Sequence, residues 1–269
     1  MEFLEAFLFG FVAFIFVGLF LFKVFEKVYV ALLNKPLYIH FYPFLKRLKR
    51  SQRVFLRNEF VFYSKLTRKE KKYFEHRVVN FIAEYEFVGK SGLVVNDQMK
   101  VHIAATSTML TFGMKNYLYD VFEHILIYPD EYYSTTTAQY HKGEFNPRVK
   151  VIAFSWKDFQ QGFSIQNNNH NLGLHEFAHA LNFQAMKSNN TSMNIFSGMF
   201  DEIMRDIHHL PNAKRLIESN YFRIYAYTNK YEFLAVILEH FFESPDQFKR
   251  EFPELYHKVE LMINFKGSR

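Results

Sequence analysis

The chain contains no cysteine among its 269 residues. This absence excludes disulfide bonds and leaves histidine and carboxylate side chains as the protein ligands for zinc. The sequence also lacks internal repeats, low-complexity tracts and any helix-turn-helix, zinc-finger or RNA-binding signature. We therefore expect no nucleic-acid partner, although the net charge is +6 and the isoelectric point is near 9.2.

A long apolar run lies near the N-terminus. Residues 3–22 are almost all apolar, and Glu5 is the only charged residue among them. At about 1.5 Å per residue, a helix of this length spans about 30 Å, the thickness of a bilayer's hydrocarbon core. The basic first segment and the small-residue cleavage site of a secretory signal are missing. We therefore predict a transmembrane anchor in contact with the lipid bilayer, with a cleaved signal as the alternative.

The distribution of basic residues predicts the orientation of this helix. Lysine and arginine stay on the cytoplasmic side of a membrane. Here they follow the apolar run: Lys23, Lys27, Lys35, Lys46, Arg47, Lys49 and Arg50. We expect a single-pass membrane protein in which residues 1–45 form the anchor and juxtamembrane segment and residues 46–269 form a catalytic domain on the cytoplasmic side. The basic stretch 46–72 suits anionic lipid headgroups.

The most informative motif is His175-Glu176-Phe177-Ala178-His179. Residues four apart lie on the same face of a helix, so His175 and His179 can bind one metal ion. Glu176 then lies beside the metal and can handle a proton. This H-E-x-x-H pattern is typical of zinc proteases. An apolar stripe on the neighbouring face would pack into the core, and the three asparagines at 167–169 offer helix caps.

A catalytic zinc site usually has three protein ligands and an open position for water, so a third ligand must come from elsewhere. Glu232 is the leading candidate, because it lies in the first turn of the helical pattern that follows Asn229. It fits equally as a capping-box partner of Asn229. Glu239 and Glu243 share roughly its helix face, and either fits as the ligand or as a hydrogen-bond partner of a histidine ring. Two further carboxylates remain as alternatives: Asp201 and Asp206.

Several segments, spread from about residue 60 to 255, resemble the Mlc titration factor A family of bacterial zinc aminopeptidase-like proteins. The matching pieces, in order, are Glu86-Phe87-Val88-Gly89, Ile127-Tyr128-Pro129-Asp130-Glu131-Tyr132, Phe154-Ser155-Trp156, His170-Asn171-Leu172 with the H-E-x-x-H motif, Tyr225-Ala226, Glu232-Phe233-Leu234-Ala235-Val236 and Phe241-Phe242-Glu243-Ser244-Pro245.

The resemblance implies one Zn²⁺ ion per chain, bound by His175, His179 and Glu232. It further implies that Glu176 is the general base and that Tyr225, seven residues before the third ligand, faces the substrate. The chain departs from the family at Asn182, where aspartate is common. An amide can still accept a hydrogen bond from an imidazole, but it adds no negative charge, so zinc affinity or water acidity would differ.

The rest of the chain mixes helical and strand patterns, with helix in excess. A capping-box pattern at 67–70 precedes a predicted helix that Gly89 and Gly92 end, and Asn96 begins another that runs through about residue 109. We also expect strands at 125–128 and 149–155 and helices at 201–208, 212–218 and 230–243. These elements predict an α+β, zincin-like metallopeptidase domain, mostly helical with a small sheet, preceded by one N-terminal transmembrane helix.

These features predict a membrane-anchored zinc peptidase with a peptide or protein substrate. Glu176 would take a proton from water, and Tyr225 would donate a hydrogen bond to the oxyanion. The strand at 149–155 would pair with an extended peptide at its edge, and the polar loop 134–147, which contains His141, would overhang the cleft. The alternative is a membrane-tethered protein that sequesters a cytoplasmic regulator and has weak or vestigial peptidase activity, since the namesake of the resembling family binds a transcriptional repressor.

Overall fold

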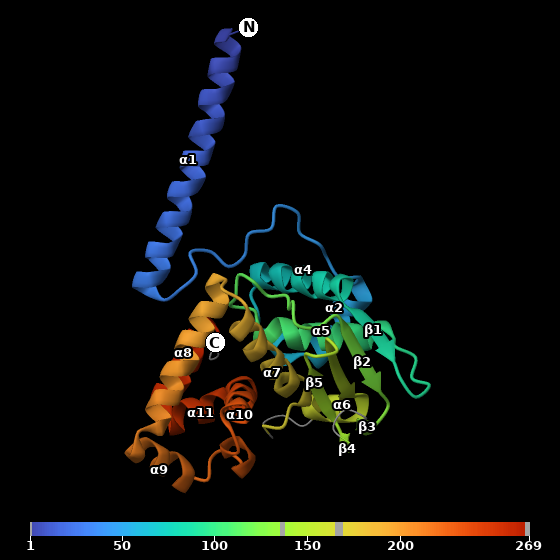
Figure 1. Ribbon diagram of the computed structural model, residues 1–269. Coiled ribbons are helices and arrows are strands. Elements are labelled where there is room, and N and C mark those ends of the chain that lie inside the picture. Colours follow the sequence, from blue (N-terminus) through green and yellow to red (C-terminus); the bar gives the residue numbers. More distant parts are fainter. Residues whose placement is uncertain (1, 135–137, 165–168, 267–269) are drawn as a thin grey trace.

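The computed structural model describes residues 2–134, 138–164 and 169–266. This part of the chain is mostly helical, with a small sheet, as predicted (Figure 1). Its helices are α1 (Glu2–Leu33), α2 (Arg50–Glu59), α3 (Val61–Lys65), α4 (Arg68–Glu84), α5 (Asp97–Leu110), α6 (Trp156–Ser164), α7 (Leu172–Lys187), α8 (Thr191–His208), α9 (Leu210–Glu218), the 3-10 helix η1 (Ile224–Tyr227), α10 (Lys230–Glu243), α11 (Pro245–Glu251) and α12 (Pro253–Met262).

Four strands form the sheet, in the order β1 (Glu86–Gly89), β2 (His124–Tyr128), β6 (Val151–Ser155) and β5 (Gly143–Asn146). The first three are parallel, and β5 runs antiparallel to β6. The two predicted strands, β2 and β6, are confirmed. The expectation that β6 receives a peptide at a free edge is wrong, because β2 pairs with one side of β6 and β5 pairs with the other. The edge strand on this side of the sheet is β5.

The segment expected to be a polar loop also contains regular structure. It holds part of a hairpin of β3 (Tyr132–Ser134) and β4 (Gln139–His141), followed by β5; residues 135–137 lie outside the described ranges. The rings of Tyr133 and Tyr140 meet across the hairpin with centroids 5.5 Å apart. Cross-strand aromatic pairs of this kind stabilise a hairpin that the polar composition of the segment does not reveal.

Local capping explains where several helices begin. Thr67 accepts a hydrogen bond from the Glu70 backbone, and the Glu70 carboxylate accepts one from the Thr67 backbone, so the predicted capping box is confirmed. Helix α5 begins at its predicted cap, Asn96. The prediction that Gly89 ends a helix is wrong. Gly89 closes strand β1 instead, and a side chain there would bring its Cβ within 1.9 Å of the Leu93 carbonyl oxygen.

Helix α7 lies at the centre of the domain, where it packs against α5, α8 and α10 and against strands β5 and β6. Its Phe177 is fully buried. The ring of Phe177 contacts four other aromatic rings, those of Phe81, Tyr119, Phe122 and Phe154. This burial directs the apolar stripe of α7 into the core and leaves the two motif histidines on another face.

Helix α1 projects away from the domain (Figure 1). Within its segment Leu4–Leu33, the most apolar 18-residue stretch has a mean hydropathy of 2.5 and is exposed. The segment is long and apolar enough to cross a membrane. The helix continues beyond the apolar run at 3–22. Its last turns contact the domain, where the Glu26 carboxylate lies 2.7 Å from Lys115 Nζ.

Candidate metal centre

The structure brings together the three side chains expected to bind a metal. His175 and His179 lie one turn apart on α7, with ring centroids 4.7 Å apart. Glu232 approaches from α10, and its carboxylate oxygens lie 3.0 Å from His175 Nε2 and 3.6 Å from His179 Nε2. One donor atom from each residue lies within 4.8 Å of the others. This spacing allows the three side chains to hold one metal ion between them.

Capping at the start of α10 leaves the Glu232 carboxylate free for this contact. The Asn229 side-chain oxygen accepts the backbone N–H groups of Tyr231 and Glu232 at 2.9 and 3.1 Å. The Glu232 side chain points toward the two histidines and does not complete a capping box. The capping role that the sequence left open for this side chain is therefore wrong.

Helix α7 begins at Asn171 and not at the asparagine run expected to cap it. The Asn171 side chain accepts the backbone N–H of Leu174 at 3.0 Å, and its own backbone N–H donates to Glu239 at 3.1 Å. Asn167 and Asn168 lie outside the described residues. Asn169 has a left-handed backbone, with φ of 54°. The helix start is thus set by a residue that is held by α10.

Glu239 supports His175 from behind. Its carboxylate lies 2.7 Å from His175 Nδ1, which turns Nε2 of the same ring toward Glu232. Arg223 donates to both oxygens of Glu239, at 2.8 and 2.9 Å. Such a carboxylate fixes the tautomer and the orientation of a ligand histidine. Glu243, the other open candidate, accepts from the side chain of Asn171 instead.

Glu176 is buried between α7 and strand β5. The backbone N–H of Phe145 in β5 faces its carboxylate and acts to lower its pKa. Gly143 lies so close that a Cβ there would be 2.8 Å from Glu176 Cγ and Oε1. Burial raises the pKa of Glu176, although His175 and His179 act in the opposite direction. A raised pKa suits a carboxylate that accepts and then releases a proton.

Tyr225 lies on η1, beside the cluster. Its ring centroid is 6.0 Å from that of His175, and 48% of the residue is exposed. Partial burial and the neighbouring Glu232 raise the pKa of Tyr225 to about 12. The hydroxyl therefore keeps its proton at neutral pH and can act as a hydrogen-bond donor.

The charges around the cluster favour a cation. Burial alone would lower the pKa of His175, but its contacts with the carboxylates of Glu232 and Glu239 outweigh burial and raise it. Contacts with His175 and His179 likewise lower the pKa of Glu232 against the effect of burial. Oε2 of Glu232 is buried without a well-aligned hydrogen bond from any described group. Two imidazoles and this oxygen fit the donor set of a catalytic zinc site.

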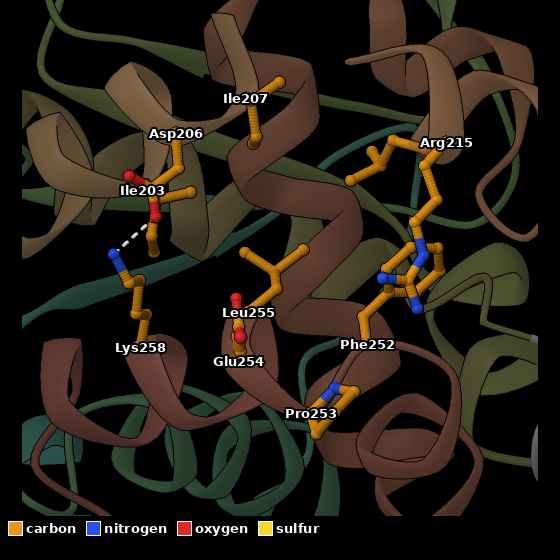
Figure 2. A pocket seen from close by; sticks show the side chains of 10 residues that line it. Ile203, Asp206, Ile207, Arg215, Phe252, Pro253, Glu254, Leu255 and Lys258 are labelled. Atoms are coloured by element: carbon orange, nitrogen blue, oxygen red, sulfur yellow. Dashed lines mark hydrogen bonds and ion pairs between the residues drawn. The ribbon is translucent and has the colours of Figure 1, made fainter. Parts of the chain in front are cut away.

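The other candidates lie elsewhere. Asp206 forms an ion pair with Lys258 and lines a separate cavity of about 130 Å³ between α8, α9 and α12 (Figure 2). Asp201 is exposed on α8. Asn182, at the position where the chain departs from the family, donates to Met186 Sδ at 3.7 Å. Within the described ranges, the group His175, His179 and Glu232 alone brings three possible donors this close together.

Sequence reasoning missed three residues that shape the centre: Asn171, Gly143 and Arg223. Asn171 carries an ordinary cap signal that three nearby asparagines obscured. Gly143 shows its role only through the approach of β5 to α7. Arg223 is the single basic residue in the segment 219–229, and its position two residues before Tyr225 is the only signal that pointed to it.

Comparisons with known proteins identify the family to which the chain belongs. Residues 45–263 match the family of glucose-regulated metallo-peptidases M90. The chain belongs to this family. The Synechocystis sp. (strain ATCC 27184 / PCC 6803 / Kazusa) protein slr2042 is 24% identical over 217 residues, which cover 72% of this chain and 76% of that protein. Mlc titration factor A of Yersinia pestis (strain Pestoides F) is 25% identical over 191 residues, which cover 65% of this chain and 70% of that protein. The family resemblance drawn from the sequence is therefore confirmed.

Proposed function

We propose that this protein is a membrane-anchored, zinc-dependent peptidase with a zincin-like catalytic domain. The observation that carries the proposal is the convergence of His175, His179 and Glu232 within 4.8 Å, with Glu176 on the same helix α7 as the two histidines. Membership of a metallo-peptidase family supports it. His175, His179 and Glu232 would hold one zinc ion per chain and leave one position open.

Zinc held by these residues supplies Lewis acidity, which activates water and polarises a carbonyl group. Glu176 takes a proton from the attacking water and delivers it to the leaving amine. Tyr225 donates a hydrogen bond to the carbonyl oxygen as negative charge develops on it. Glu239 and Arg223 keep the His175 ring in one orientation during this cycle.

Strand β5 is the proposed binding edge for the substrate. It is the last strand of the sheet on this side, and it contacts both α7 and the carboxylate of Glu176. An extended peptide that pairs with β5 would add a strand there and bring a peptide bond close to Glu176. Sheet, metal helix and substrate edge together motivate our assignment to the zincin-like class.

Two variants of the purified chain test this function. Wild type should contain about one zinc ion per chain, and the double variant His175→Ala/His179→Ala should contain none, because an incomplete ligand set does not hold the metal. Glu176→Gln should keep the zinc but lose cleavage of a peptide library by several orders of magnitude. Full zinc content in the double variant, or normal turnover by Glu176→Gln, would contradict the proposal.

The membrane part of the proposal rests on α1. We propose that α1 spans the bilayer and that the domain faces the cytoplasm, because basic residues follow the apolar run. The full-length chain should then resist alkaline extraction from membranes, and protease added outside intact cells should leave the domain uncut. Digestion of the domain under those conditions would reverse the orientation.

A second candidate function is sequestration of a cytoplasmic regulatory protein. It is favoured by the relative named Mlc titration factor A. Binding alone needs no general base, so Glu176→Gln separates the two functions. If sequestration is the main activity, this variant should hold its partner as well as wild type does while any peptide cleavage is lost.

A further inference from the structure

The loop between α1 and α2 exposes large apolar side chains. Phe41 is 73% exposed, Phe44 is 89% exposed and Leu45 is 37% exposed. Exposed apolar side chains that cluster on one short loop indicate a contact surface rather than ordinary surface scatter. We term residues 38–45, which carry these three side chains, the aromatic loop.

The aromatic loop is held in place by its inward-facing residues. His40 stacks on Tyr73 with ring centroids 4.6 Å apart, and the Tyr42 hydroxyl accepts from Arg77 Nε at 2.6 Å. Arg77 is fully buried and also donates to the Ile39 carbonyl. Because these neighbours already fill the inner side, the two phenylalanines cannot turn inward, and they stay exposed at little further cost in chain entropy.

The same loop is tied to the end of α1. Lys115 pairs with Glu26 of α1 at 2.7 Å, and its ammonium lies 4.0 Å from the centroid of the Tyr38 ring. Asn34 donates to Met199 Sδ at 3.0 Å. In Figure 1 the blue loop arches out on the side of the domain from which α1 projects. A bilayer crossed by α1 would therefore meet this loop.

The charges around the loop complement an anionic surface. Lys35 precedes the aromatic loop and Lys46 follows it directly, and both are exposed. Aromatic side chains next to lysines are typical of segments that lie at the level of lipid headgroups. Continuity with α1 and this charge pattern together favour a lipid bilayer over a protein partner as the occupant.

We propose that Phe41 and Phe44 insert into the headgroup region of an anionic bilayer, as a second membrane contact beside α1. This inference rests on the membrane anchoring included in the proposed function. With two fixed contacts the domain cannot swivel about its anchor, so the metal centre keeps one orientation relative to the membrane surface. A substrate that approaches along the membrane would then always reach the metal centre from the same side.

Because the chain has no cysteine, a label attached to one introduced cysteine reports on that position alone. The full-length chain is placed in nanodiscs of phosphatidylcholine with phosphatidylglycerol, and an environment-sensitive fluorophore is attached to one cysteine in each variant. Phe41→Cys and Phe44→Cys test the loop. Val94→Cys, on an 82% exposed residue between β1 and α5, is the aqueous control, and Ile15→Cys in α1 is the membrane control.

Fluorophores at 41 and 44 should emit at shorter wavelength than the one at 94 and should be quenched several-fold more by lipids that carry a quencher. Both readouts report protection of the fluorophore from water, and in discs of phosphatidylcholine alone this protection should decrease. If the fluorophore at 15 is protected while those at 41 and 44 behave like the one at 94, the second contact is refuted and the anchor stands. If the fluorophore at 15 is also aqueous, the anchor itself fails. Equal protection in neutral discs would refute the role of the lysines.

Discussion

Replacing Gly143 by alanine probes the link between strand β5 and the proposed general base. A methyl group at this position would lie 2.7 Å from Leu172 Cδ1 and 2.8 Å from Glu176 Cγ and Oε1. Carbon atoms in good contact are about 3.5–4.0 Å apart, so these groups must separate by about 1 Å. Rotation of the Glu176 side chain gives the easiest relief, and it moves the carboxylate away from its working position.

We expect Gly143→Ala to retain zinc, because none of the three proposed ligands is touched. A misplacement of about 1 Å in a catalytic group lowers turnover by about 10²-fold, whereas crowding of this size costs only about 1–3 kcal/mol of stability. The assay is kcat on a cleaved peptide, measured together with zinc content and thermal unfolding. The predicted signature is a loss of activity much larger than the loss of folded protein.

Gly198→Ala is the matched control. Gly198 lies inside α8, and a Cβ there would meet nothing within 4 Å. This variant should gain about 0.5–1 kcal/mol of stability from its higher helix propensity and keep full activity. If Gly143→Ala turns over substrate as wild type does, β5 does not hold Glu176 in place. If it loses zinc, Gly143 supports the whole centre and not the base alone.

Three further outcomes follow from the structure. Glu232→Ala should lose zinc in a chelator competition, whereas Asn229→Ala should keep it and lose about 1 kcal/mol of stability; zinc retention by Glu232→Ala would contradict its role as a ligand. Glu239→Gln should bind zinc about 10- to 100-fold more weakly with an unchanged fold, since it loses the carboxylate behind His175; wild-type affinity would make this contact structural only. Burial lowers the pKa of His102 to about 4, so this imidazole stays neutral in the folded chain while the unfolded chain takes up a proton below pH 6.5. Protonation of His102 in the unfolded chain alone favours unfolding. The free energy of unfolding is therefore unaffected by this group above pH 6.5 and falls by about 3 kcal/mol in total as the pH drops toward 4. In urea unfolding of the detergent-solubilised chain with chelator present, His102→Phe should therefore show a smaller drop in stability from pH 7 to pH 5 than wild type, and an equal drop would refute the assignment.

The motif histidines were predictable because their geometry is local. His175 and His179 need only one helical turn to share a face, and the sequence itself specifies that turn. The role of Glu232 was not decided by its spacing, because the same position supports a cap and a ligand. Only the packing of α10 on α7 decides which contact its carboxylate makes. The helix caps at Thr67 and Asn96 were predictable for the same local reason.

The features that sequence reasoning missed depend on contacts between distant segments. No pattern around Gly143 announces that its strand will press against Glu176. The edge of the sheet was assigned to 149–155 because β-branched residues mark a strand without showing how many partners it has. Strand β5 has a weak pattern of its own, and its pairing with β6 through Phe145 and Ile152 appears only in the fold.

Glu239 explains why two helices can present three donors at a fixed separation. Its carboxylate binds the His175 ring and, through the other oxygen, the backbone N–H of Asn171, where α7 begins. One side chain of α10 therefore holds α7 at its cap and again one turn later, while Arg223 compensates the buried charge. Since Glu232 lies two turns earlier on the same helix α10, the contact that orients His175 also sets the position of Glu232 against both histidines. The spacing of seven residues between Glu232 and Glu239 thus links metal geometry to the packing of α7 on α10, and a shift of either helix along the other would break both contacts at once.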